Sequence, residues 1–258
     1  MSDEHGPEPQ TLDNPAGRLY FWISEIRDVI SAPDRRVSEG IQIFAEVFAL
    51  DPKKRADILS AVTDLLKLPE QIRVSIRKNS DVSDKFLNLL PVVDQYLESL
   101  LGGLSNQGVG IAQDGVFANL GVISEQLSMF APEIVPDRDV LQGLKTSVND
   151  LIDEISQTEI DDELASFLLD ELLDIRLAIE RFDLLGEKPL SDAFAKLVGE
   201  VGIRRETIEA DESSEAEAIR NKFAGIIRRV YEVLSFGGNA IQISTFVTAA
   251  LEAGHIHL

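Results

Sequence analysis

The sequence contains no cysteine and only three histidines. Without cysteine the chain has no disulfide, no thiolate zinc site and no thiol nucleophile. The histidines, His5, His255 and His257, all lie near the ends of the chain. Chain ends are usually poorly held in place, whereas a catalytic triad needs a histidine fixed in a structured pocket. The sequence therefore disfavours triad-type catalysis.

Basic residues are also scarce, because 24 Lys and Arg stand against 45 Asp and Glu, a formal net charge of −21. Nucleic-acid binders neutralise phosphates with Lys and Arg, so we expect no direct nucleic-acid binding. Residues 1–10 lack the apolar stretch of a signal peptide. The sequence has no run of about 18 uncharged apolar residues, so it predicts no transmembrane helix. We therefore expect a cytoplasmic protein.

Aromatic residues make up only 6% of the chain, and no segment alternates apolar and polar residues over the length of a strand. Leu, Ile, Ala and acidic residues are abundant, and this balance favours helices. We expect an all-α fold, a multi-helix bundle of two packed helical halves that ends in an apolar helical hairpin. Pro132 and Pro136 mark the boundary between the halves. The expected parts are a disordered arm over 1–13, a helical domain over 14–131, and a helical bundle over 137–258 with an acidic segment 150–217 and an apolar tail 218–258.

Capping residues and prolines predict where helices begin. Asn14-Pro15 and Asp51-Pro52 each combine an N-cap residue with a proline suited to a first helical turn. Ser214 with Glu217 predicts a capping box that opens a helix from about residue 215 to 235.

Two segments read as irregular. Residues 102–121 hold six glycines and predict a flexible loop or weak helix that joins the two halves. Gly108 and Gly110 begin a Gly-x-Gly-x-x-Gly pattern, but Gln113 stands at its third glycine and no strand precedes it, which disfavours a dinucleotide site. Residues 203–214 predict an acidic, irregular stretch.

A long helix is expected over residues 161–184, with two apolar stripes. Because it is apolar on two sides, we expect it at the centre of the C-terminal bundle. One stripe contains Leu164, Phe167, Leu168, Leu172, Ile175, Ile179 and Phe182. The opposite stripe contains Leu169, Leu173 and Leu177, and the remaining polar stripe holds Glu163, Asp170, Asp174 and Arg181.

Most of the excess charge lies in residues 150–217, where 21 acidic and 6 basic side chains give a net charge of −15. One interpretation is solubility alone. Another is docking to a basic surface, which speeds encounter and fixes orientation. That surface belongs either to another protein or to this chain, which would then dock within one copy or self-associate. The basic residues that would supply it here are Lys53, Lys54, Arg55, Arg73, Arg77 and Lys78.

The C-terminal tail has the opposite character, because residues 233–251 include no charged side chain. Three interpretations remain open. The tail is a buried helical hairpin, a helix pair that binds a partner or a second copy, or a membrane-associating segment. Its large apolar side chains are Phe236, Ile241, Ile243, Phe246 and Val247, followed by Leu251.

Carboxylates are the only plentiful reactive groups. Asp150, Asp153 and Glu154 lie within about one helical turn, and Glu171 and Asp174 lie on the next expected helix. This spacing resembles the ExxE…ExxD arrangement of the all-α nucleotide pyrophosphohydrolases of the MazG type, with Asp in place of Glu at both positions of the first pair. The resemblance implies Mg²⁺ held between facing helices by carboxylate oxygens, the ligands that magnesium prefers.

Taken together, the sequence favours a non-catalytic, acidic interaction or regulatory protein, such as an adaptor, an inhibitor or an assembly subunit. It needs no cofactor, and its partner is a protein with a basic surface or a second copy. A membrane-associating effector that uses residues 218–258 and a Mg²⁺-dependent nucleotide hydrolase are the alternatives. The candidate partner-binding residues are Glu163, Asp170, Asp174, Phe236, Ile241, Ile243, Phe246 and Val247.

Overall fold

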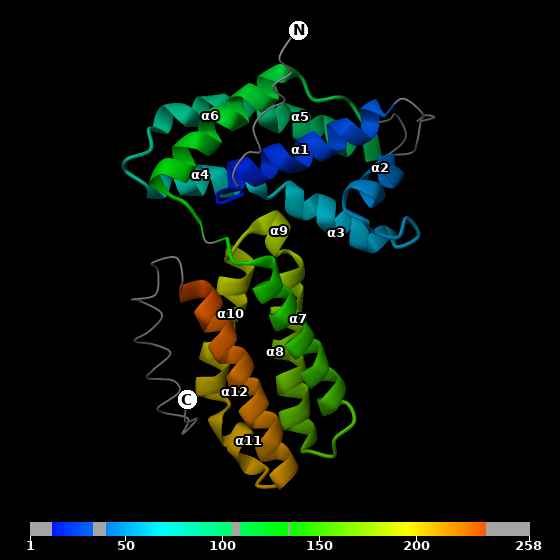
Figure 1. Cartoon of the computed structure of the whole chain (residues 1–258), viewed down its shortest axis with the longest axis vertical. Helices are drawn as coiled ribbons and strands as arrows, with labels where there is room; N and C mark the ends of the chain where they lie inside the picture. Colours follow the sequence, from blue (N-terminus) through cyan, green and yellow to red (C-terminus); the bar gives the residue numbers. More distant parts are fainter. Residues whose placement is uncertain (1–11, 33–39, 105–108, 134, 236–258) are drawn as a thin grey trace. The chain divides into compact units, whose positions relative to one another are not determined.

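The structure of the chain is a computed structural model, which describes residues 12–32, 40–104, 109–133 and 135–235 (Figure 1). Every element in these residues is a helix, which confirms the all-α prediction for the described part of the chain. The chain divides into two compact units, Met1–Glu133 and Ile134–Leu258.

The first unit is built around helix α1, which packs against α2, α4 and α6. On its inner side Leu19, Ile23 and Ile26 are fully buried. The ring centroid of Trp22, also on α1, is 5.1 Å from the ring centroid of Phe48. The elements of this unit are α1 (Pro15–Ser31), α2 (Gly40–Val47), α3 (Arg55–Leu65), α4 (Leu68–Lys78), the 3-10 helix η1 (Asp84–Leu89), α5 (Leu90–Gly102) and α6 (Asp114–Phe130).

The predicted start of α1 is confirmed. The side chain of Asn14 accepts a hydrogen bond from the backbone N–H of Gly17 at 2.8 Å, as an N-cap does. Its amide also donates to the hydroxyls of Ser124 and Ser128 on α6. Because buried polar groups must find partners, these bonds fix the beginning of α1 against α6.

An ion pair between buried Arg18 and partly exposed Glu133 lies beside this cap. Arg18 is buried, and its Nη1 atom is 2.6 Å from Oε2 of Glu133. Arg18 also donates to the backbone carbonyl of Leu12, and the backbone N–H of Glu133 donates to Asp13. The disordered arm predicted over residues 1–13 is therefore wrong at positions 12 and 13, while residues 1–11 lie outside the described part.

Two predicted boundaries in this unit are wrong. Asp51-Pro52 does not open a helix, because the backbone N–H of Lys54 donates to the carbonyl of Asp51 and closes a turn. Helix α3 starts after that turn, at Arg55. The glycine-rich stretch is also shorter than expected, since α6 begins at Asp114 and belongs to the first unit.

The second unit is a four-helix bundle. Helix α8 packs against α7 and α10, and α12 packs against α7 and α10, so the four helices form a closed ring in section. Figure 1 shows them lying alongside one another. The helices of this unit are α7 (Arg138–Ile155), α8 (Asp162–Glu180), α9 (Phe182–Leu185), α10 (Lys188–Ile203), α11 (Arg205–Ala210) and α12 (Ser214–Ser235).

The core of the bundle contains the first predicted apolar stripe, from Leu164 to Ile179 on α8 and Phe182 on α9. The single helix predicted over residues 161–184 is wrong at its end, because α8 stops at Glu180 and a separate short helix follows. Asp161 caps α8, because its side chain accepts hydrogen bonds from the backbone N–H groups of Glu163 and Leu164. After α9, Gly186 has φ 71° and ψ −153°, a conformation open almost only to glycine. This residue lets the chain turn from α9 into α10.

Two further details of this unit differ from the sequence prediction. Residues 205–210 form the short helix α11, where an irregular stretch was expected. The cap of α12 is Ser213, whose hydroxyl accepts from the backbone N–H of Ala216 at 3.2 Å, so the predicted capping box at Ser214 and Glu217 is wrong. The second limb of the expected C-terminal hairpin lies outside the described residues.

Candidate functional site

The outward side of α8 carries two exposed leucines. Leu173 and Leu177 are 39% and 44% exposed, and residues four apart lie on the same side of an α-helix. Leu169, one turn earlier, is partly buried against the core. The prediction that all three leucines form a packed stripe is therefore wrong for the outer two. Because α8 is one of four helices arranged in a ring around the core, only one side of it faces the other helices of the ring.

Acidic residues border these leucines along the helix. Asp170 lies three residues before Leu173, and Glu180 lies three residues after Leu177, so all four share one side of α8. Asp170 is exposed, and Glu180 is 3.1 Å from the ammonium group of Lys145 on α7. We call Asp170, Leu173, Leu177 and Glu180 the α8 face. The predicted residue Glu163 is exposed about two turns before it.

The third predicted acidic residue of α8 makes a structural contact. Asp174 and Glu171 both bind Lys196 of α10, with Nζ at 2.7 Å from Asp174 and 3.0 Å from Glu171. The hydrogen bond that Lys196 donates to Asp174 is the largest cause, and the one that it donates to Glu171 the second largest, of the raised pKa of its ammonium group. Glu171 is only 3% exposed, and a buried carboxylate needs a counter-charge. Lys196 therefore ties α10 to α8.

The carboxylates that resemble a magnesium site are not brought together. On α7, Asp150 and Asp153 are exposed, and Glu154 is 2.6 Å from the ammonium group of Lys222 on α12. The α8 pair binds Lys196 on α10 instead, so the two sets turn toward different neighbouring helices. Within the described residues, no three Asp, Glu or His side chains gather as metal ligands would.

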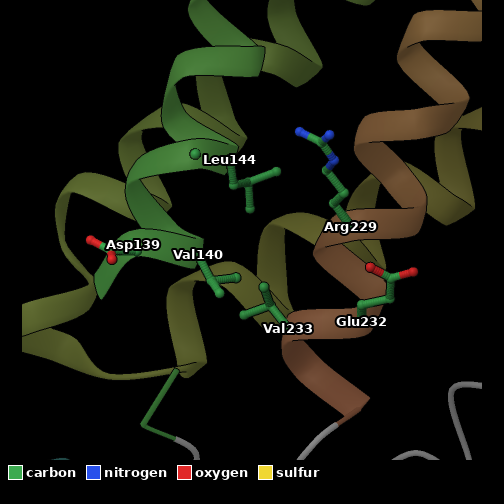
Figure 2. A pocket seen from close by; sticks show the side chains of 7 residues that line it. Asp139, Val140, Leu144, Arg229, Glu232 and Val233 are labelled. Atoms are coloured by element: carbon green, nitrogen blue, oxygen red, sulfur yellow. The ribbon is translucent and has the colours of Figure 1, made fainter. Parts of the chain in front are cut away.

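A groove lies between the beginning of α7 and the end of α12 (Figure 2). Its volume is about 350 Å³, and its apolar lining comes from Val140, Gly143 and Leu144 of α7 and Val233 of α12. In Figure 2 the side chains of Val140 and Val233 point toward one another. No sequence pattern predicted this groove.

The predicted apolar residues of the tail lie outside the described part of the chain. None of the helices that the structure describes is long and apolar enough to span a bilayer. The tail residues that lie outside the described part are Phe236, Ile241, Ile243, Phe246 and Val247.

The basic residues predicted to form a basic surface lie at two places in the first unit, apart from Arg73. One group is exposed on the turn before α3 and at its first residue, and another is exposed at the end of α4. Arg73 is engaged within the unit, where it forms ion pairs with Asp94 and Glu70. Of the basic residues predicted to form a basic surface, the exposed ones are Lys53, Lys54, Arg55, Arg77 and Lys78.

Sequence reasoning missed Lys196 and placed Leu173 and Leu177 in the core. The acidic residues were a usable signal for the leucines, because Asp170 and Glu180 fall on the same helical side as both of them. A stripe that mixes leucine with carboxylates is more typical of a surface than of a core. The sequence pattern contained no comparable signal for Lys196, because its partners are fixed by the packing of α8 against α10.

Comparison with known protein families, with curated proteins and with solved structures found no match to this chain.

Proposed function

We propose that this chain is a non-catalytic interaction protein, which binds another protein through the α8 face. The observation that carries the proposal is the exposed pair Leu173 and Leu177, bordered along one helix by Asp170 and Glu180. Exposed apolar side chains rimmed by polar groups are typical of interaction sites.

The chemistry of the α8 face defines the kind of partner. Two leucines at a spacing of four residues suit the apolar side of an amphipathic helix, which packs its own residues at the same spacing. The acidic segment 150–217 has a net charge of −15, so the polar side of that helix should be basic. Such charge complementarity raises the association rate and excludes acidic partners.

The proposal can be tested with a synthetic amphipathic helical peptide that carries leucines on one side and lysines on the other. Binding to the full chain is measured by fluorescence anisotropy at several salt concentrations. We expect binding that weakens with salt and weakens about tenfold or more in the double variant Leu173→Ser, Leu177→Ser, since buried apolar anchors dominate such interfaces.

Two controls make this experiment specific. Ile203 on α10 is 79% exposed and lies outside the α8 face, so Ile203→Ser should leave peptide binding unchanged. A peptide of the same composition with scrambled order should bind weakly. Equal binding of both peptides, or no effect of the double leucine variant, would contradict the proposal and leave only attraction between opposite net charges.

A further inference from the structure

The groove between α7 and α12 begins where the polar bridges between these helices end. Along their contact, Lys222 binds Glu154 and Arg229 donates from Nη1 to the hydroxyl of Ser147 at 2.6 Å. Beyond that bond, toward the start of α7, the apolar groove follows. Val140 at its rim is 51% exposed, whereas Leu144 and Val233 form a buried floor.

The charged residues beside the groove do not point into it. In Figure 2 the carboxylates of Asp139 and Glu232 point away from Val140 and Val233, to opposite sides. The guanidinium of Arg229 is held by Ser147. A neutral apolar segment can therefore cover the valines without burying a charge, which would be costly.

Gly143 keeps the groove open. It lies inside α7, where glycine is less favourable than alanine. A Cβ atom placed on Gly143 would meet no atom within 4 Å. The described structure thus gives no steric reason for glycine here, whereas a segment seated in the groove would supply one.

The chain itself supplies a neutral apolar segment at this place. Helix α12 ends at Ser235, two residues after Val233 of the groove floor. In the sequence Phe236 comes next and Gly237-Gly238 follow it, and glycine adopts backbone conformations that allow a sharp reversal. From residue 233 to residue 251 the sequence has no charged side chain.

We propose that residues 236–251 fold back onto the groove of the same chain and place apolar side chains against Val140, Leu144 and Val233. Attachment through α12 favours this occupant over a second copy, because a tethered segment meets its site at an effective concentration on the order of mM. The inference is independent of the α8 face, which lies on another helix.

Hydrogen exchange of the full chain tests this proposal. The variant Gly143→Leu fills the groove, and leucine favours a helix more than glycine does, so the bundle should remain folded. We expect the amides of residues 239–251 to be protected in the unmodified chain and to exchange about tenfold faster or more in the variant. Gly225→Leu is the matched control, because Gly225 is also a helical glycine with no atom within 4 Å of a Cβ, but it lies outside the groove.

Unprotected tail amides in the unmodified chain, or equal exchange in the unmodified chain and Gly143→Leu, would overturn the proposal.

A second measurement uses the absence of native cysteine. With Val140→Cys and Ile241→Cys introduced together, mild oxidation should cross-link within one chain, and far more efficiently than the pair Ile203→Cys and Ile241→Cys.

Two other outcomes would also overturn it. Cross-links that join two chains would show that a second copy supplies the segment. Flotation of the unmodified chain with vesicles of phosphatidylcholine and phosphatidylserine, lost in a chain that ends at Ser235, would show that the segment is accessible to lipid.

Discussion

The ammonium group of Lys196 on α10 binds two carboxylates of α8, those of Glu171 and Asp174. The two carboxylates differ in exposure, because Glu171 is buried while Asp174 is about half exposed. The second oxygen of Glu171, Oε2, has no hydrogen-bond partner in the described structure. The stability of the contact between α8 and α10 therefore depends on Lys196 more than the exposure of its side chain suggests.

Replacing this lysine should destabilise the second unit. In Lys196→Ala the Glu171 carboxylate stays buried without a counter-charge, so we expect the free energy of unfolding to fall by about 1–3 kcal/mol. Urea unfolding of the variant and the unmodified chain, followed by circular dichroism, measures the loss.

The matched control is Lys188→Ala. Lys188 pairs with Asp192 one turn later on α10, and both side chains are mostly exposed. Exposed pairs of this kind contribute about 0–1 kcal/mol, so the control should change little. Equal losses in the two variants would show that burial of Glu171 has no special effect.

At the scale of helices, two similar sequence signals had different outcomes. Asn14-Pro15 opens α1, but Asp51-Pro52 forms a turn, in which the Asp51 carboxylate accepts from the backbone N–H of Lys53 at 2.9 Å. Asp followed by Pro suits both a helix start and a β-turn. The sequence of the dipeptide could not separate the two structures, because tertiary packing decides between them.

The long helix α8 illustrates what sequence periodicity can predict. Its inner stripe, which includes Leu164 and Leu172, was placed correctly in the core. Periodicity could not tell whether the opposite leucines met a further helix, because that depends on how the helices surround one another. The exposure of Leu173 and Leu177 therefore became evident only from the closed ring of α7, α8, α10 and α12.

The start of α12 gives a prediction at this scale. Ser213 caps the helix, and its backbone N–H donates to the side chain of Asp211, which fixes it in place. Ser213→Ala should lower the free energy of unfolding by about 1 kcal/mol, as loss of an N-cap does. Thermal unfolding followed by circular dichroism would measure the effect.

Ser214→Ala provides the comparison, because the hydroxyl of Ser214 donates to the exposed side chain of the neighbouring Glu215. It should leave stability nearly unchanged. A larger loss in Ser214→Ala than in Ser213→Ala would support the capping box predicted from sequence instead.

At the scale of the whole chain, each unit draws its core from its own helices. In the second unit the buried cluster runs from Leu141 to Leu234. The first unit has α1 at its centre, with its own buried residues. A unit with a core of its own can fold alone.

We therefore expect the fragments Met1–Glu133 and Ile134–Leu258 to fold separately. Each should give a helical circular dichroism spectrum and a cooperative thermal transition, and the two spectra should add to that of the full chain. If either fragment lacked a cooperative transition, its stability would depend on the other unit.

The place of Trp22 has an optical consequence. It is the single tryptophan of the chain and lies in α1, at the centre of the first unit, with Phe21 and Phe48 beside its ring. The bundle that follows contains no tryptophan. Indole emission therefore reports on the first unit alone, whereas far-ultraviolet dichroism sums the helices of both, so one denaturant titration of the native chain yields two separable curves without any added label.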